Sequence, residues 1–191
     1  MFDGVVDPTQ YFGGVWTNAL QDSGKTMAAF FQGCFEAGSA GCAFWASSPE
    51  AIRANLDALY AKVLREPVPV VLPDGRHGIL DHDKLRNTVA AAMYSPYLLF
   101  PYIAQGLAQL AQGDGRTLYS ILAKQNFDCN CKTSDAELFA EVGEGGEAIM
   151  CNDTPRVGGL AEIVAFYNQV SGDSEWGPML TKVRAPCGFV C

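Results

Sequence analysis

The chain has 191 residues, of which 49% are hydrophobic and 18% charged, and its net charge is −8. This composition excludes a disordered protein and predicts a single domain over residues 1–191 with a sizeable core. The 21 acidic residues outnumber the 13 lysine and arginine residues, which argues against a nucleic-acid partner. No segment approaches the about 18 apolar residues that a membrane span needs.

Helical patterns begin near the N-terminus. Apolar residues at helical spacing predict short helices over residues 9–20 and 26–36. A longer helix is expected to start at Ser48-Pro49, because serine can cap a helix and proline suits its first position. Apolar residues recur at helical spacing over residues 52–64, and Pro67 ends this helix.

One β signal follows this helix. Two apolar segments, 68–72 and 77–80, flank Pro73-Asp74-Gly75. Asp-Gly between apolar segments indicates a tight hairpin. Asp81 can then cap the next helix.

The rest of the chain is again helical. Ser95-Pro96 repeats the cap-then-proline start, and Gly113 is placed to end that helix. Shorter helices are expected over residues 116–124 and 160–170, and a long loop or flap over 125–147. The predicted fold is therefore mainly α, a helical domain with one small β-hairpin.

Two segments resemble the motifs of nucleotide-binding proteins and of serine hydrolases, but each lacks a glycine that its motif requires. Ser23-Gly24-Lys25-Thr26 resembles the end of a phosphate-binding loop, but Ala19 occupies the position of the required earlier glycine. A plain helix start is the better interpretation. Ser39 lies in a near miss for G-x-S-x-G, because Ala37 replaces the first glycine, so we expect a loop serine and not a nucleophile.

One of the two histidines could serve as a catalytic base. His82 lies between Asp81 and Asp83, and a carboxylate could orient its imidazole as a catalytic base. The other interpretation of the same residues is a solvated capping turn. His77 lies in the predicted hairpin, and no serine or cysteine is tied by a motif to either histidine.

The seven cysteines leave at least one thiol unpaired in a monomer. Cys34 and Cys42 flank a turn of small residues, a spacing that suits a disulfide closing a helix end. Cys129-x-Cys131 has no second ligand pair nearby, so we expect no metal and no cofactor. The first residues carry no signal-peptide pattern, which would place a complete chain in the cytoplasm, although the cysteines suggest secretion; the localisation stays open.

Several segments together resemble one family. Phe2-Asp3-Gly4-Val5-Val6-Asp7-Pro8 resembles the strand after the nucleophile region in tripeptidyl-aminopeptidase-like α/β-hydrolases. Phe30-Phe31-Gln32 with Gly41-Cys42-Ala43 resembles the cysteine-bearing cap helix of that family, and Met93-Tyr94-Ser95-Pro96 its central cap helices. The segment from Trp176 to Cys187-Gly188 resembles the exit from the cap. The resemblance is collinear and covers nearly the whole chain.

This resemblance implies a cap, or lid, without its hydrolase core. In the family the G-x-S-x-G serine precedes this region, and the acidic and histidine members of the triad follow it. No catalytic residue of the family can therefore be carried over. The secreted setting of the family implies an inherited Cys34–Cys42 disulfide and a second one between Cys151 and Cys187.

A lid shapes a pocket with apolar and aromatic side chains. We therefore expect a free-standing protein that binds a small apolar molecule, and that performs a non-hydrolytic cyclisation or isomerisation of secondary metabolism if it is an enzyme. The alternatives are a fragment of a serine hydrolase or peptidase, inactive without its core, and a non-catalytic binding protein. A homodimer could cover the exposed cap face. The candidate catalytic residues are Asp7, Tyr11, Tyr94, Tyr97 and His82, and the candidate pocket residues are Phe12, Trp16, Phe100 and Tyr102.

Overall fold

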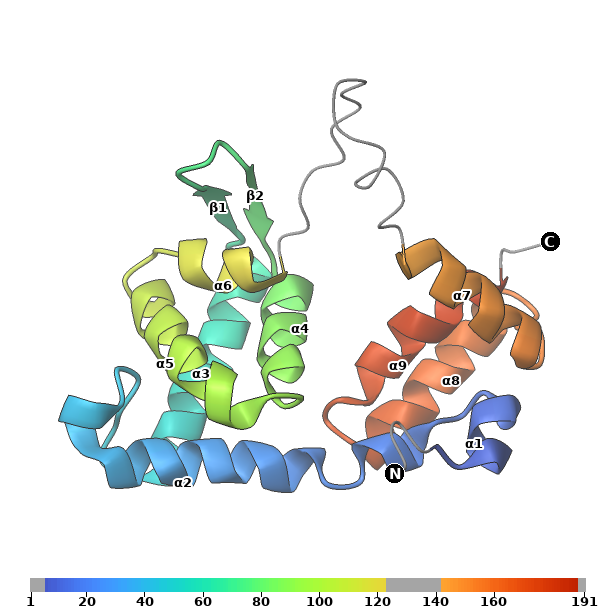
Figure 1. Cartoon of the computed structure of the whole chain (residues 1–191), viewed down its shortest axis with the longest axis horizontal. Helices are drawn as coiled ribbons and strands as arrows, with labels where there is room; N and C mark the ends of the chain where they lie inside the picture. Colours follow the sequence, from blue (N-terminus) through green and yellow to red (C-terminus); the bar gives the residue numbers. More distant parts are fainter. Residues whose placement is uncertain (1–5, 123–141, 189–191) are drawn as a thin grey trace. The chain divides into compact units, whose positions relative to one another are not determined.

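The computed structural model describes residues 6–122 and 142–188. Within these residues the chain forms nine α-helices, two 3-10 helices and one two-stranded antiparallel hairpin (Figure 1). The predicted mainly α fold with one small hairpin is confirmed.

The described residues divide into two compact units. Residues 25–122 form the unit that we call the central unit, after its place in the sequence. Residues 6–24 and 142–188 form the terminal unit. Compactness does not by itself make either unit an independently folding domain, so the single-domain prediction stays a prediction.

The central unit follows the predicted start signals closely. Ser48 Oγ accepts a hydrogen bond from the Ala51 amide at 3.1 Å, and Asp81 Oδ1 accepts one from the Lys84 amide at 2.8 Å. Gly113 has φ +92°, the left-handed conformation that ends a helix. The elements are α2 (Ser23–Gly41), whose first two residues belong to the other unit, α3 (Pro49–Arg65), β1 (Val68–Val71), β2 (His77–Leu80), α4 (His82–Ala92), α5 (Pro96–Ala111) and α6 (Arg116–Leu122).

The core of the central unit forms where α3, α4 and α5 meet. Each helix contributes an apolar stripe at three- and four-residue steps, which places these side chains on one face. The fully buried members of these stripes include Ile52, Val63, Leu85, Val89, Ile103, Leu107 and Leu110.

The hairpin packs against α6. Val68 pairs with Leu80, and Val71 pairs with His77. Val70 and Leu80 are buried while Val71 and Ile79 are exposed, which is the alternation of a sheet with one covered face.

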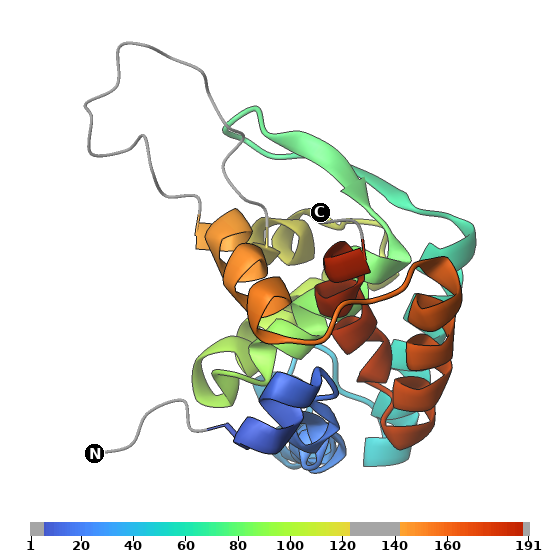
Figure 2. The ribbon, with the colours of Figure 1, turned by 90° about the vertical axis from the view of Figure 1, so that its right-hand side faces the viewer.

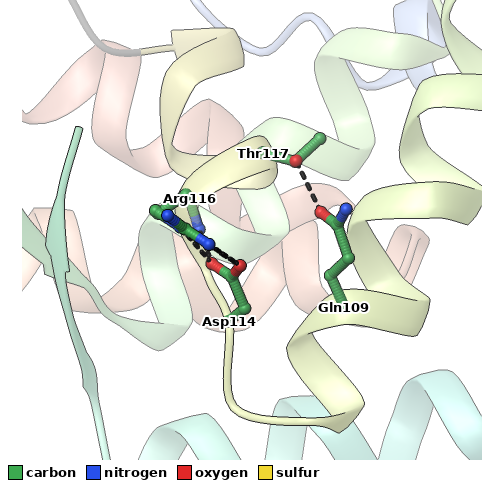
Figure 3. Close-up of polar contacts among 4 residues, drawn as sticks. All are labelled: Gln109, Asp114, Arg116 and Thr117. Carbon is green, nitrogen blue, oxygen red and sulfur yellow. Dashed lines mark hydrogen bonds and ion pairs between the residues drawn. The ribbon is translucent and has the colours of Figure 1, made fainter. Parts of the chain in front are cut away.

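A polar turn joins α5 to α6 (Figure 3). Asp114 accepts hydrogen bonds from the Arg116 amide at 3.0 Å and from Arg116 Nη2 at 2.6 Å, and the Thr117 hydroxyl donates to Gln109 Oε1 at 2.5 Å. The hydrogen bonds from Arg116 lower the pKa of Asp114 to about 2. The Asp114 carboxylate therefore stays charged and helps to hold the start of α6.

The terminal unit is built from both ends of the described chain. Helices α8 and α9 lie side by side in both views (Figures 1 and 2). The elements are α1 (Pro8–Gly13), the 3-10 helix η1 (Thr17–Leu20), α7 (Val142–Asp153), α8 (Leu160–Asp173), α9 (Gly177–Arg184) and the 3-10 helix η3 (Ala185–Gly188).

The structure differs from the sequence-based expectations at four places. The helix expected over 9–20 is two short helices, because Gly14 turns left-handed with φ +69° and ends α1. Helix α2 is longer than the expected 26–36, and it includes Ser39 beyond a non-helical break at Gly38. Helix α7 begins inside the segment expected to be a loop, and α9 was not predicted.

Each unit contains one disulfide. Cys34 and Cys42 are joined in the central unit with their Cα atoms 5.2 Å apart, and Cys151 and Cys187 in the terminal unit with theirs 4.9 Å apart. Both expected pairings are therefore confirmed. The other three cysteines, including the Cys129-x-Cys131 pair, lie outside the described residues.

Candidate functional site

The candidate residues fall into both units. Tyr94 and Tyr97 are 92% and 98% exposed on the central unit, and Tyr102 is also exposed. Phe100 packs edge-on against Phe30, with ring centres 5.1 Å apart, beside a groove that the Cys34–Cys42 disulfide also lines. These residues are not gathered around one pocket. Their catalytic and pocket roles stay predictions, and so does a homodimer that would cover this surface.

His82 lies at the start of α4. Its neighbour Asp81 is the N-cap, accepting from the Lys84 amide, and the Asp81 carboxylate lies 3.5 Å from Lys84 Nζ. The His82 ring packs edge-on against Tyr60, with ring centres 5.9 Å apart. This is the geometry of the capping turn, and a role as catalytic base stays a prediction.

Three other candidates, Asp7, Tyr11 and Trp16, line a single cleft of about 500 Å³ in the terminal unit. They come from the N-cap of α1, from α1 itself and from the residue before η1. The remaining lining residues come from the same segments and from α7 and α9: Val6, Gln10, Asn18, Ala19, Gln21, Met150 and Val183.

Tyr11 connects the cleft to α7. Its hydroxyl donates a hydrogen bond to Asp153 Oδ2 at 3.2 Å. Partial burial raises the pKa of Tyr11, and the hydrogen bond and negative charge of Asp153 raise it further. The hydroxyl therefore remains protonated at neutral pH and acts as a donor, not as a base. No local signal points to Asp153, because 142 positions separate the two residues.

Trp16 holds an unusual backbone conformation. Its φ is +55°, which is rare for a bulky side chain. The indole Nε1 donates to the Tyr11 carbonyl oxygen at 3.0 Å, and the Arg184 guanidinium carbon lies 5.9 Å from the centre of the indole ring. These contacts stabilise a conformation that costs energy, and such outliers concentrate at functional sites.

Asp7 has a structural task at the cleft. One carboxylate oxygen accepts from the Thr9 amide at 2.8 Å and caps α1, while the other accepts from Asn18 Nδ2 at 3.3 Å. Phe12, the fourth candidate in this region, is 56% exposed and packs edge-on against Tyr11, but it does not line the cleft. The structure thus brings together Asp7, Tyr11 and Trp16 and leaves Phe12 at the side.

Residues 6–122 and 142–188 contain no cluster of three potential metal ligands. None of the helices in these ranges combines the length and apolar character required to cross a bilayer. The resemblance to a hydrolase cap stays a prediction, as does the absence of a cofactor. Comparisons with protein-family models, with curated proteins and with solved structures find no match for this chain.

Proposed function

We propose that this chain binds a small, mainly apolar molecule in the cleft lined by Tyr11 and Trp16. The observation that carries the proposal is the cleft itself, about 500 Å³ in volume with an aromatic wall. This volume lies within the range of roughly 300–1,000 Å³ that is usual for small-molecule sites. Val6, Met150 and Val183 extend the apolar surface.

The charge of the lining restricts the ligand. Among the described residues that line the cleft, Asp7 alone is charged, and Gln10, Asn18 and Gln21 supply side-chain amides. A carboxylate without a neighbouring cation disfavours an anionic ligand. The ligand class is therefore a neutral or cationic molecule with an apolar body and a hydrogen-bonding end.

A non-hydrolytic reaction of the bound molecule stays a secondary proposal. The pair that favours it is Tyr11 and Asp153, because a protonated hydroxyl beside a carboxylate can carry a proton. In the structure this hydroxyl donates to Asp153, so it would have to turn toward the ligand to take part. Binding is therefore the function that the geometry supports best.

Titration with N-phenyl-1-naphthylamine, a neutral apolar fluorescent probe, tests the proposal. Ala19 is an exposed lining residue, so Ala19→Trp should fill the cleft without removing a contact and weaken binding by about tenfold or more. Ala61→Trp is the matched control, because Ala61 is exposed on α3 in the central unit. Its affinity should equal that of the wild type.

Two outcomes would contradict the proposal. If Ala19→Trp and Ala61→Trp bind the probe equally well, the cleft is not the site. If the folded wild-type chain does not bind the probe, the alternative of a fragment that is inactive without its core is favoured. A second variant, Tyr11→Phe, keeps the aromatic wall and should retain binding to within about threefold, since it removes only one hydrogen bond.

A further inference from the structure

A second, smaller pocket lies in the terminal unit, with a volume of about 140 Å³. Its lining comes from residues 13–15, from the segment before α8, and from α8, α9 and the start of η3. We propose that this pocket binds a small aliphatic monocarboxylate, with the carboxylate held by Arg184 and Thr181. The inference is independent of the apolar cleft, because neither Arg184 nor Thr181 lines that cleft.

The first argument is the buried charge of Arg184. The residue is 7% exposed, and its two terminal nitrogen atoms donate to the Thr154 hydroxyl and the Pro155 carbonyl oxygen, which are both neutral. Within the described ranges no carboxylate lies within 4.0 Å of the guanidinium. Burial lowers the pKa of Arg184. Arginine nevertheless keeps its proton in proteins, so this buried positive charge has no counter-ion among the residues that the structure describes.

The second argument is an unsatisfied hydroxyl beside that charge. Thr181 Oγ1 is buried and has no hydrogen-bond partner among the residues that the structure describes. Thr181 precedes Arg184 by three positions on α9, so the two side chains lie on the same helical face. Both residues line the pocket. The guanidinium has more N–H groups than its two hydrogen bonds use, and once the buried Thr181 hydroxyl turns toward the pocket, both side chains can donate to one anion.

The charges around the pocket indicate a ligand with one negative charge. Arg156 and Glu162 also line the pocket, and both are exposed. Glu162 Oε2 accepts from the Gly158 amide at 2.6 Å, so this carboxylate is committed to the start of α8. Two cations and one carboxylate leave a net charge of +1. A monoanion therefore fits better than a dianion such as phosphate.

The size and the apolar lining indicate a short aliphatic chain. Cavities of about 150 Å³ hold molecules of benzene's size, so 140 Å³ suits a ligand of about six non-hydrogen atoms. Val15, Val157, Ile163 and Phe166 supply apolar lining surface for its tail. Butanoate has this size, this charge and this division into a polar head and an apolar tail.

Isothermal titration of the full chain with butanoate tests the proposal. We expect saturable binding, and butanamide, its neutral isostere, should bind at least about tenfold more weakly because a charged partner is lost. Thr181→Val should weaken butanoate binding by about fivefold while leaving the melting temperature unchanged or higher, because it removes an unsatisfied buried hydroxyl. Arg156→Gln should weaken binding several-fold, whereas Arg65→Gln, an equal charge change in the central unit, should not.

The outcomes separate this site from the cleft. Ala19→Trp should bind butanoate like the wild type, whatever its effect on the apolar probe. No saturable butanoate binding, equal affinity for butanoate and butanamide, or tighter binding of inorganic phosphate would each overturn the proposal. Wild-type affinity in both Thr181→Val and Arg156→Gln would also overturn it.

Discussion

Replacing Gly14 with alanine should destabilise the terminal unit through two separable effects. The first is the backbone, because Gly14 has φ +69° and ψ 24°, and this left-handed conformation costs an L-residue about 1 kcal/mol. The second is a collision with Arg184. The added Cβ would lie 2.6 Å from Arg184 Cζ and 2.7 Å from Nη2, so the buried guanidinium would have to move.

The second effect should be the larger. A displaced guanidinium loses its hydrogen bonds to Thr154 and Pro155 and its position over the Trp16 ring. Leaving a charged group without these acceptors costs about 2 kcal/mol. Together with the backbone term, we expect Gly14→Ala to lower the free energy of unfolding by about 3 kcal/mol.

A double-mutant cycle separates the two effects. Trp16 and Trp176 both lie in the terminal unit, so urea unfolding followed by tryptophan fluorescence in a Trp45→Phe background reports on that unit. In an Arg184→Leu background, Gly14→Ala should cost only about 1 kcal/mol, which gives a coupling energy of about 2 kcal/mol. Gly172→Ala is the control in the same unit, and it should stabilise α8 slightly because its Cβ meets open space within a helix. An equal loss from Gly14→Ala in both backgrounds would refute the reasoning.

Two further predictions concern the disulfides and acid stability. Replacing both cysteines of a pair by alanine should cost about 2.5 kcal/mol for Cys34–Cys42 and about 4 kcal/mol for Cys151–Cys187, because the entropy of loop closure grows with the sequence separations of 8 and 36. Urea unfolding of the two double variants measures this, and an equal or reversed order would contradict it. The pKa of Asp114 is about 2 in the folded chain against an ordinary 3.8, so its contribution to stability is full above about pH 4 and is lost as the pH falls through about 2. Asp114→Asn should therefore lose less stability than the wild type between pH 4 and pH 2 in thermal unfolding, and parallel curves for the two proteins would count against this role.

Features that depend on neighbouring residues could be predicted from the sequence. Ser48-Pro49 and Ser95-Pro96 begin α3 and α5, and Asp-Gly lies in the turn of the hairpin, because helix starts and turns use local chemistry. The Ser48 side chain caps its helix as expected, whereas the Ser95 side chain makes no capping hydrogen bond. Gly14 was missed as a helix end, since the apolar pattern continues past it. The spacing of apolar residues alone does not show where a left-handed residue interrupts a helix.

The candidate site was predictable only in part, for a similar reason. Tyr11 and Trp16 were identified because they lie close together on an aromatic segment, and the structure places both at one cleft. Asp153 and Arg184 carried no local signal. The role of Asp153 depends on a partner 142 positions away. The charge of Arg184 gains its significance only from tertiary packing, which buries it with no carboxylate of the described residues within 4.0 Å.

The terminal unit is built from two segments that lie far apart in the sequence, and this determines when it can fold during synthesis. Tyr11 emerges from the ribosome long before Asp153, and Gly14 long before Arg184, so the contacts that α1 and η1 make with α7 and α9 must wait until those helices have been synthesised. Residues 25–122, by contrast, are continuous and can complete their core earlier. During that interval Tyr11 and Trp16 lack the contacts that they later make with Asp153 and Arg184, so their aromatic rings are open to association with other chains.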